Sequence, residues 1–223
     1  MKIYYINLKR RPDRDAQMAR ELSDVKLAAE RIEATDGLEL NTVERRGGLT
    51  MGEVGCLISH ENVLESFLLS GAEFALVLED DAKFSREIPW PDYLETLAHA
   101  MTNKKIDLLQ LGYLENVPTS LLGRIHLSLH RARTRAMTRR IQLRGYEYVF
   151  VFREFLAGTH GYVVSRLGAG HLLMQLSKAE KPVDGLYQMV AQKRKIKVAR
   201  LARSEINQQS RGHSISGIDS DVA

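Results

Sequence analysis

The sequence FALVLEDDAKF (residues 74–84) is the most informative stretch of this chain, because five apolar residues lead directly into three acidic ones. A short apolar run of this kind is typical of a buried β-strand. Glu79, Asp80 and Asp81 would then follow the carboxyl end of that strand. Open α/β sheets bind their ligands at this edge. The stretch therefore predicts both a core strand and a binding site at its end.

The rest of the first half alternates strand and helix patterns around this stretch. Apolar strand patterns occur at residues 2–8, 30–34, 74–78 and 106–111, and helical patterns at 12–25, 50–69 and 92–101. Thr50 and Glu53 have the spacing of a capping box at the start of the second helix. Alternation of this order predicts an α/β fold with a mostly parallel sheet flanked by helices.

The second half is less regular. Strand patterns occur at residues 146–152, 159–164 and 196–201, and a helical pattern at 166–176. Residues 124–144 show little apolar periodicity and are expected to form an exposed excursion. The tail from Ser204 has no core-forming pattern. We therefore expect a single domain over residues 1–203 and a C-terminal tail, 204–223, that contributes to or covers the ligand site.

Composition limits the class of protein. The 223 residues are 44% hydrophobic, which suits one domain with a sizeable core. No apolar run approaches the roughly 20 residues that cross a bilayer, and the N-terminus lacks the apolar region of a secretory signal. The single cysteine, Cys56, excludes an intramolecular disulfide. These features predict a cytoplasmic protein.

Basic residues cluster in two segments, at 124–144 and 193–203, within a net charge of +4. Such clusters suggest a polyanionic neighbour, either an anionic membrane surface or nucleic acid, although a solvated surface would have the same composition. The arginine segments lack interleaved aromatic residues, which argues against recognition of single-stranded nucleic acid.

The three acids suggest a cation. Like charges held close together repel unless something offsets them, and hard carboxylate oxygens suit Mg²⁺ or Mn²⁺. Glu79 and Asp81 occupy alternate positions and would point the same way if the extended conformation continued. The alternative is an acid-rich turn without function.

Three arginines, Arg10, Arg11 and Arg14, lie at the start of the first predicted helix. The helix dipole makes that end positive, so further cations there are unfavourable by themselves. An anion bound nearby, such as a diphosphate, would offset them. The alternative is surface neutralisation by Asp13 and Asp15. Together with the acids, the arginines suggest a nucleotide diphosphate bridged to a cation.

Six blocks in this order resemble glycosyltransferase family 25: INLKRRPDR (6–14), TDG (35–37), LTMGEVGCLISH (49–60), LVLEDDAKF (76–84), GTHGYVVSRLGAGHLL (158–173) and PVDGL (182–186). That family contains bacterial lipooligosaccharide and lipopolysaccharide galactosyltransferases, and animal collagen galactosyltransferases are related. The resemblance implies a Rossmann-like fold of the GT-A type, a nucleotide-sugar donor, most often UDP-galactose, and inversion at the anomeric carbon.

The resemblance also implies roles for individual residues. Glu79 to Asp81 would replace the Asp-x-Asp motif of GT-A enzymes, with Glu79 and Asp81 as metal ligands and His213 as a further ligand. Residues expected to border the donor are Asn7, Leu8, Arg10, Arg14, Asp36, Glu53, His60 and Asp80. Glu53 could instead only cap its helix, His60 could be a core histidine, and His213 a free residue of the tail.

The expected reaction is attack of an acceptor hydroxyl on the sugar, with a carboxylate removing its proton. Asp184 is the expected base and Glu115 the reserve, although Asp184 also fits a helix N-cap. The acceptor would be a lipooligosaccharide, lipopolysaccharide or other glycan, with the basic segments against the inner membrane. The alternatives are a metal-dependent phosphohydrolase, for which no nucleophile motif is evident, and a basic nucleic-acid-binding module.

Overall fold

The computed structural model describes residues 1–41, 46–114 and 134–208. Its helices are α1 (Pro12–Asp24), α2 (Met51–Leu69), α3 (Trp90–Lys104), α5 (Arg166–Leu176) and α6 (Val183–Lys193). Its strands are β1 (Lys2–Asn7), β2 (Glu30–Glu33), β3 (Phe74–Glu79), β4 (Ala82–Phe84), β5 (Leu108–Gly112), β6 (Thr138–Leu143), β7 (Tyr146–Phe152), β8 (Gly161–Ser165), β9 (Val198–Leu201) and β10 (Ile206–Gln208).

Within these ranges, a mixed sheet of eight strands has the order β2-β1-β3-β8-β5-β9-β7-β6. Strand β1 pairs in parallel with both β2 and β3, as the alternating first half predicts. Strand β8 lies antiparallel between β3 and β5, so the parallel order is interrupted there. The carboxyl ends of β1 and β3 therefore lie side by side, and this edge is where the acidic residues are found.

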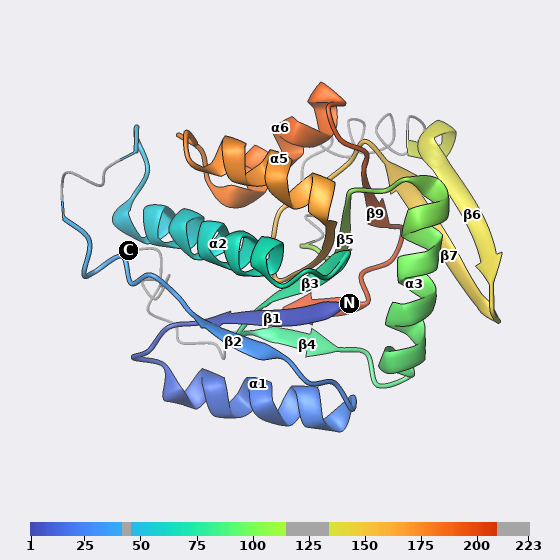
Figure 1. Ribbon diagram of the computed structural model, residues 1–223, viewed down its shortest axis with the longest axis horizontal. Helices are drawn as coiled ribbons and strands as arrows, with labels where there is room; N and C mark the ends of the chain where they lie inside the picture. Colours follow the sequence, from blue (N-terminus) through green and yellow to red (C-terminus); the bar gives the residue numbers. More distant parts are fainter. Residues whose placement is uncertain (42–45, 115–133, 209–223) are drawn as a thin grey trace, which may run out of the picture.

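Helices cover both faces of the sheet (Figure 1). Alternate residues of each central strand face opposite sides. Tyr4 and Val77 pack with α2, α5 and α6, whereas Tyr5 and Leu78 pack with α1 and α3. Burying each large apolar side chain of this kind contributes about 1.5–3 kcal/mol. The α/β fold class is confirmed, and the layers agree with the Rossmann-like, GT-A type arrangement.

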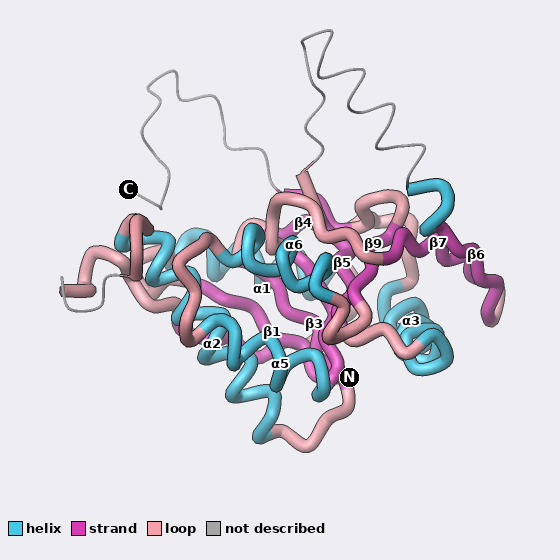
Figure 2. The backbone as a smooth tube through the Cα atoms, turned by 90° about the horizontal axis from the view of Figure 1, so that it is seen from above, coloured by secondary structure: helices cyan, strands magenta, loops and turns pink. Residues whose placement is uncertain are grey.

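The second half contains strands that the sequence did not predict. Residues 138–143, expected within an exposed excursion, form β6 and pair antiparallel with β7, and residues 115–133 of that segment lie outside the described residues. The β6–β7 hairpin lies beside α3 at one end of the molecule (Figure 2). The expectation failed because β6 has only two apolar residues, and its partner β7 and the nearby α3 supply the apolar contacts.

The beginning of the tail also belongs to the fold, although its sequence shows no core-forming pattern. Strand β10 pairs antiparallel with β4, and Ile206 is fully buried. Gly161 makes room for it, since a Cβ there would lie 2.9 Å from Ile206 Cδ1. The backbone carbonyl of Ile206 also lies 3.2 Å from His160 Nε2. These contacts bring Gln208 to the edge of the sheet where β3 ends.

Within the described part of the chain, every helix is too short or too polar to span a bilayer.

Candidate functional site

A cavity of ≈ 160 Å³ lies at the carboxyl ends of β1 and β3. The strand ends form one wall, the first half of α2 another, and the segment 34–37 and the end of β10 complete it. Its lining residues are Ile6, Leu8, Arg14, Ala34, Thr35, Asp36, Gly37, Gly52, Cys56, Ser59, His60, Glu79, Asp80, Asp81 and Gln208. The sequence-predicted Leu8, Arg14, Asp36, His60 and the three acids are thus brought together.

The extended conformation of β3 ends at Glu79, and Asp80 and Asp81 form a turn. Each of the three acids therefore has its own partners. Asp80 accepts a hydrogen bond from Asn7 Nδ2 at 2.8 Å and pairs with Arg14 at 3.2 Å. Burial raises the pKa of Asp80, while these two partners act in the opposite direction. Asp80 therefore ties the end of β3 to β1 and α1.

Asp81 is the acid whose bonding is least complete. Its Oδ2 accepts a hydrogen bond from Gln208 Nε2 at 2.6 Å. Its Oδ1 is buried and has no hydrogen-bond partner within the described ranges. Burial, followed by the charge of Glu79, raises the pKa of Asp81 to about 6. A buried carboxylate oxygen without a partner is costly, so this oxygen fits a cation or a donor group of a ligand.

Glu79 lies at the opposite side of the acid cluster, toward β8. It accepts a short hydrogen bond from Thr159 Oγ1, and its Oε1 lies 3.7 Å from His60 Nε2. Burial raises the pKa of Glu79, but the contacts with His60 and Thr159 outweigh burial, so the pKa is lowered overall. Glu79 is therefore held as a carboxylate facing the cavity.

The donor set fits a hard divalent cation only in part. Among the residues that the structure describes, no group of three or more His, Cys, Asp or Glu side chains could hold a metal ion. The predicted ligand His213 lies outside the described residues. Mg²⁺ sites commonly use one or two carboxylates and complete their shell with substrate phosphates and water. Asp81, whose Oδ1 has no hydrogen-bond partner within the described ranges, fits that pattern.

The predicted arginines differ in their surroundings. Arg14 lines the cavity beside Asp80. Arg10 pairs with Asp36 at 2.5 Å, next to the lining, and Arg11 pairs with the exposed Asp13. Burial acts to raise the pKa of Asp36, but the backbone N–H of Leu38 and the Arg10 guanidinium lower it overall. The start of α1 thus places two of its three arginines at or beside the cavity.

Three of the residues predicted to border the donor do not line the cavity: Arg10, described above, Asn7 and Glu53. Asn7 is buried and accepts a hydrogen bond from Arg31 through its Oδ1, in addition to its bond with Asp80. Glu53 accepts from the backbone N–H of Thr50 at 2.8 Å and completes a capping box at the start of α2. Asn7 and Glu53 therefore hold the elements around the cavity in place and do not face the cavity themselves.

Asp184, the predicted base, lies in the first turn of α6, whose N-cap is Pro182. Its Oδ1 accepts from the Gly185 N–H at 2.7 Å and its Oδ2 from the Gly158 N–H at 3.4 Å. Burial, then the charges of Glu79, Asp184 and Glu53, raise the pKa of the Cys56 thiol. Cys56 lines the cavity, but Asp184 is not among the described residues that line it. The reserve base Glu115 lies outside the described residues.

Close backbone contacts fix the segment 34–37 against α2. A Cβ on Gly55 would lie 2.6 Å from the carbonyl oxygen of Thr35, and one on Gly37 2.6 Å from that of Met51. Ser59 Oγ accepts from the Thr35 N–H at 2.9 Å and donates to the Gly55 carbonyl. Two glycines and one serine thus allow the loop carrying Asp36 to approach the helix backbone.

Replacing Gly55 with alanine should therefore destabilise the fold by about 1–3 kcal/mol, because the loop must move away from α2. A fall in melting temperature of about 2–10 °C would report this loss. Gly170→Ala in α5 is the matched control, since a Cβ there meets nothing within 4 Å and alanine favours a helix. Equal melting temperatures for Gly55→Ala and wild type would show that the loop does not depend on this contact.

Several site residues were not predicted from the sequence. Gln208 reaches Asp81 from β10, Thr159 reaches Glu79 from the segment before β8, and Ser59 holds the loop. Tyr162 and Tyr187 contact His60 from β8 and α6. For Thr159, its place as the first residue of the predicted strand 159–164 was a usable signal, whereas a lone glutamine in a polar tail gives none.

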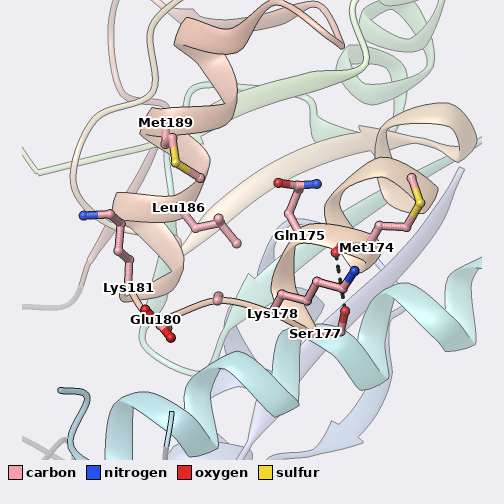
Figure 3. A pocket seen from close by; sticks show the side chains of 9 residues that line it. Met174, Gln175, Ser177, Lys178, Glu180, Lys181, Leu186 and Met189 are labelled. Atoms are coloured by element: carbon pink, nitrogen blue, oxygen red, sulfur yellow. Dashed lines mark hydrogen bonds between the residues drawn. The ribbon is translucent and has the colours of Figure 1, made fainter. Parts of the chain in front are cut away.

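A second cavity, of ≈ 440 Å³, lies between α5 and α6 (Figure 3). Methionine and leucine side chains and two lysines, Lys178 and Lys181, surround it. Among the described residues that line it, Glu180 is the one acid and none belongs to a strand. These residues form no carboxylate cluster, so the cavity at β1 and β3 is the candidate site.

Residues 1–187 match the family model described as "Glycosyltransferase family 25 (LPS biosynthesis protein)". Procollagen galactosyltransferase 1 of Danio rerio is 30% identical over 204 residues, 82% of this chain and 30% of that protein. The human inactive glycosyltransferase 25 family member 3 is 32% identical over 128 residues, 49% of this chain and 21% of that protein. The chain thus spans less than a third of either relative.

Among solved structures, the S. aureus TarS fragment 1–349 in complex with UDP-GlcNAc matches with a TM-score of 0.43 and 13% sequence identity. The alignment covers 95% of this chain and 59% of that one.

Proposed function

Because this chain belongs to glycosyltransferase family 25, we propose that it transfers a sugar from a nucleotide donor to a hydroxyl group of a glycan. The donor in this proposal is UDP-galactose, and the reaction inverts the anomeric carbon. One observation carries the proposal: a cavity at the carboxyl ends of β1 and β3 has an open carboxylate oxygen on Asp81 and the guanidinium of Arg14 on its wall.

The cationic side of the cavity suits the diphosphate of the donor. Arg14 lines it, and Arg10 lies beside it through its pair with Asp36. Guanidinium groups bind phosphate oxygens through two parallel hydrogen bonds. The start of α1 adds the positive end of its dipole. These groups would hold the diphosphate and offset the charge that develops as UDP departs.

Asp81 would hold Mn²⁺ or Mg²⁺ through Oδ1, with Gln208 fixing the other carboxylate oxygen. Such a cation supplies a Lewis acid for the departing diphosphate. Asp80 does not share this role in our proposal, because Asn7 and Arg14 occupy its oxygens. The protein thus separates a structural acid from a cation-binding acid in adjacent positions.

Asp184 is the proposed general base. Backbone N–H groups of Gly158 and Gly185 hold its carboxylate at the start of α6. From there it would accept the proton of the attacking acceptor hydroxyl. The acceptor in this proposal is a lipooligosaccharide, lipopolysaccharide or related glycan, in line with the words "LPS biosynthesis protein" in the family description. Basic residues 193–195 would face the anionic inner membrane.

A panel of nucleotide sugars with Mn²⁺ tests this function. We expect UDP-galactose to raise the melting temperature by about 5–10 °C at a hundredfold excess over its dissociation constant. UDP release in the presence of a glycan acceptor should accompany this binding. Because one relative is named inactive, binding and turnover are measured separately. Stabilisation by GDP-sugars alone would contradict the donor, and binding without any UDP release would contradict the transfer.

A further inference from the structure

A buried chain of polar groups lies behind His60, a residue that borders the cavity. His60 Nδ1 is 2.9 Å from the hydroxyl of Tyr162, which is 3.3 Å from the hydroxyl of Tyr187. All three side chains are at most 1% exposed. The rings are also packed together, with His60 stacked on Tyr162 and Tyr187 edge-on to both. The imidazole therefore has a fixed position and orientation.

The hydrogen bonds among these three side chains determine which nitrogen of His60 carries a hydrogen. If Tyr162 donates to Nδ1, the hydrogen of a neutral ring is on Nε2. The opposite tautomer would turn the Nε2 lone pair toward the Glu79 carboxylate 3.7 Å away, which is unfavourable. A charged ring carries hydrogens on both nitrogens. In either favourable state, Nε2 carries a hydrogen on the side of Glu79, which lines the cavity together with His60.

That donor has no hydrogen-bond partner within the described ranges, although the Glu79 carboxylate is its neighbour. His60 Nε2 is buried and makes no hydrogen bond there, because 3.7 Å to Glu79 Oε1 exceeds hydrogen-bond range. A buried donor without a partner is costly unless a ligand satisfies it. A hydroxyl oxygen can lie about 2.8 Å from both Nε2 and Oε1, accepting from the first and donating to the second. The pair therefore matches a group that is both donor and acceptor.

We propose that His60 and Glu79 bind one hydroxyl group of the transferred sugar, with Tyr162 and Tyr187 as positioning residues that keep the Nε2 donor pointed at the cavity. This assignment rests on the proposed function. In it, Glu79 binds the sugar and Asp81 binds the cation. Thr159 supports it by holding Glu79 through a hydrogen bond from the side of β8. In this assignment, His60 and Glu79 contact the sugar and not the nucleotide.

The test compares the affinities of UDP and of a UDP-sugar for the full chain by titration calorimetry with Mn²⁺. The probes are UDP, UDP-galactose and UDP-glucose, and the sugar bound most tightly by wild type is used for the variants. His60→Asn should weaken binding of the UDP-sugar about tenfold, as expected for one lost hydrogen bond. Binding of UDP should stay within about twofold, because no nucleotide contact is lost.

Rescue and control variants separate this role from a merely structural one. Glutamine can place an amide N–H near the position of Nε2, so His60→Gln should retain more of the UDP-sugar affinity than His60→Asn. Tyr162→Phe should weaken binding of the UDP-sugar but not of UDP, because His60 Nδ1 loses its hydrogen-bond partner. Tyr148→Phe is the matched control, since this buried tyrosine donates to Tyr93 in the opposite core and should leave both affinities unchanged.

The outcomes distinguish this inference from the proposed function. If wild type binds none of the probes, the proposed function fails. If wild type binds UDP and a UDP-sugar but His60→Asn and Tyr162→Phe weaken both equally, only the sugar assignment is overturned. If Tyr162→Phe does not fold, the two His60 variants decide the question through the ratio of their affinity for the UDP-sugar to their affinity for UDP. The same ratio in His60→Asn and His60→Gln would refute the assignment.

Discussion

Asp81→Asn is expected to lower turnover by a factor of about 10²–10³, the scale of losing one electrostatic contact to the departing charge. Asparagine keeps the shape of the side chain but removes the charge that would hold the cation. It also removes a buried negative charge beside Glu79 and Asp80, so the melting temperature should stay the same or rise. The measurement pairs initial rates of UDP release with thermal unfolding of the protein without ligands.

Asp13→Asn is the control for that variant, because Asp13 is 63% exposed and pairs with Arg11 on the surface. Surface pairs of this kind contribute about 0–1 kcal/mol, so this control should keep the wild-type rate. Full turnover of Asp81→Asn would contradict its assignment as the cation-binding acid. A basic nucleic-acid-binding module would instead be indifferent to Asp81→Asn and would show affinity that falls steeply with salt.

Asp184→Asn is expected to lower kcat by a factor of about 10²–10⁴, the usual contribution of a general base. The amide keeps an acceptor oxygen for the N–H of Gly185 but cannot take a proton from the acceptor hydroxyl. Affinity for UDP should remain near the wild-type value, since Asp184 does not line the donor cavity. Steady-state kinetics and calorimetry on the same preparation measure both quantities.

Asp92→Asn provides the matched control, because Asp92 lies in the first turn of α3 as Asp184 lies in that of α6. Loss of the favourable dipole contact affects both variants similarly, by about 0.3–1 kcal/mol of stability. An equal kcat for Asp184→Asn and wild type would leave Asp184 with only its role at the helix start.

Local patterns predicted the elements that depend on local physics. The apolar run before Glu79 became β3, and the Thr50–Glu53 capping box begins α2 as expected. Local patterns could not predict that β8 pairs with β3 and β5, because residues far apart in the chain meet there. Strand β10 has one fully buried residue, Ile206, whose burial depends on the space above Gly161.

The same division holds for the candidate site. The acids after a predicted strand pointed to Asp81, the arginines at a predicted helix start to Arg14, and the family resemblance to Asp36; all three line the cavity. Their partners come from distant segments, such as Gln208 for Asp81 and Thr159 for Glu79. Polar residues of this type carry no periodic signal in a sequence, because their role depends on which strand end lies opposite.

A crystal of the full chain soaked with UDP and Mn²⁺ would show whether the cavity at β1 and β3 holds both. We expect anomalous density for manganese bonded to Asp81 Oδ1 and to the UDP diphosphate, with Arg14 against the phosphates. Manganese and UDP bound together at any other surface, with the cavity at β1 and β3 occupied by water, would contradict this expectation.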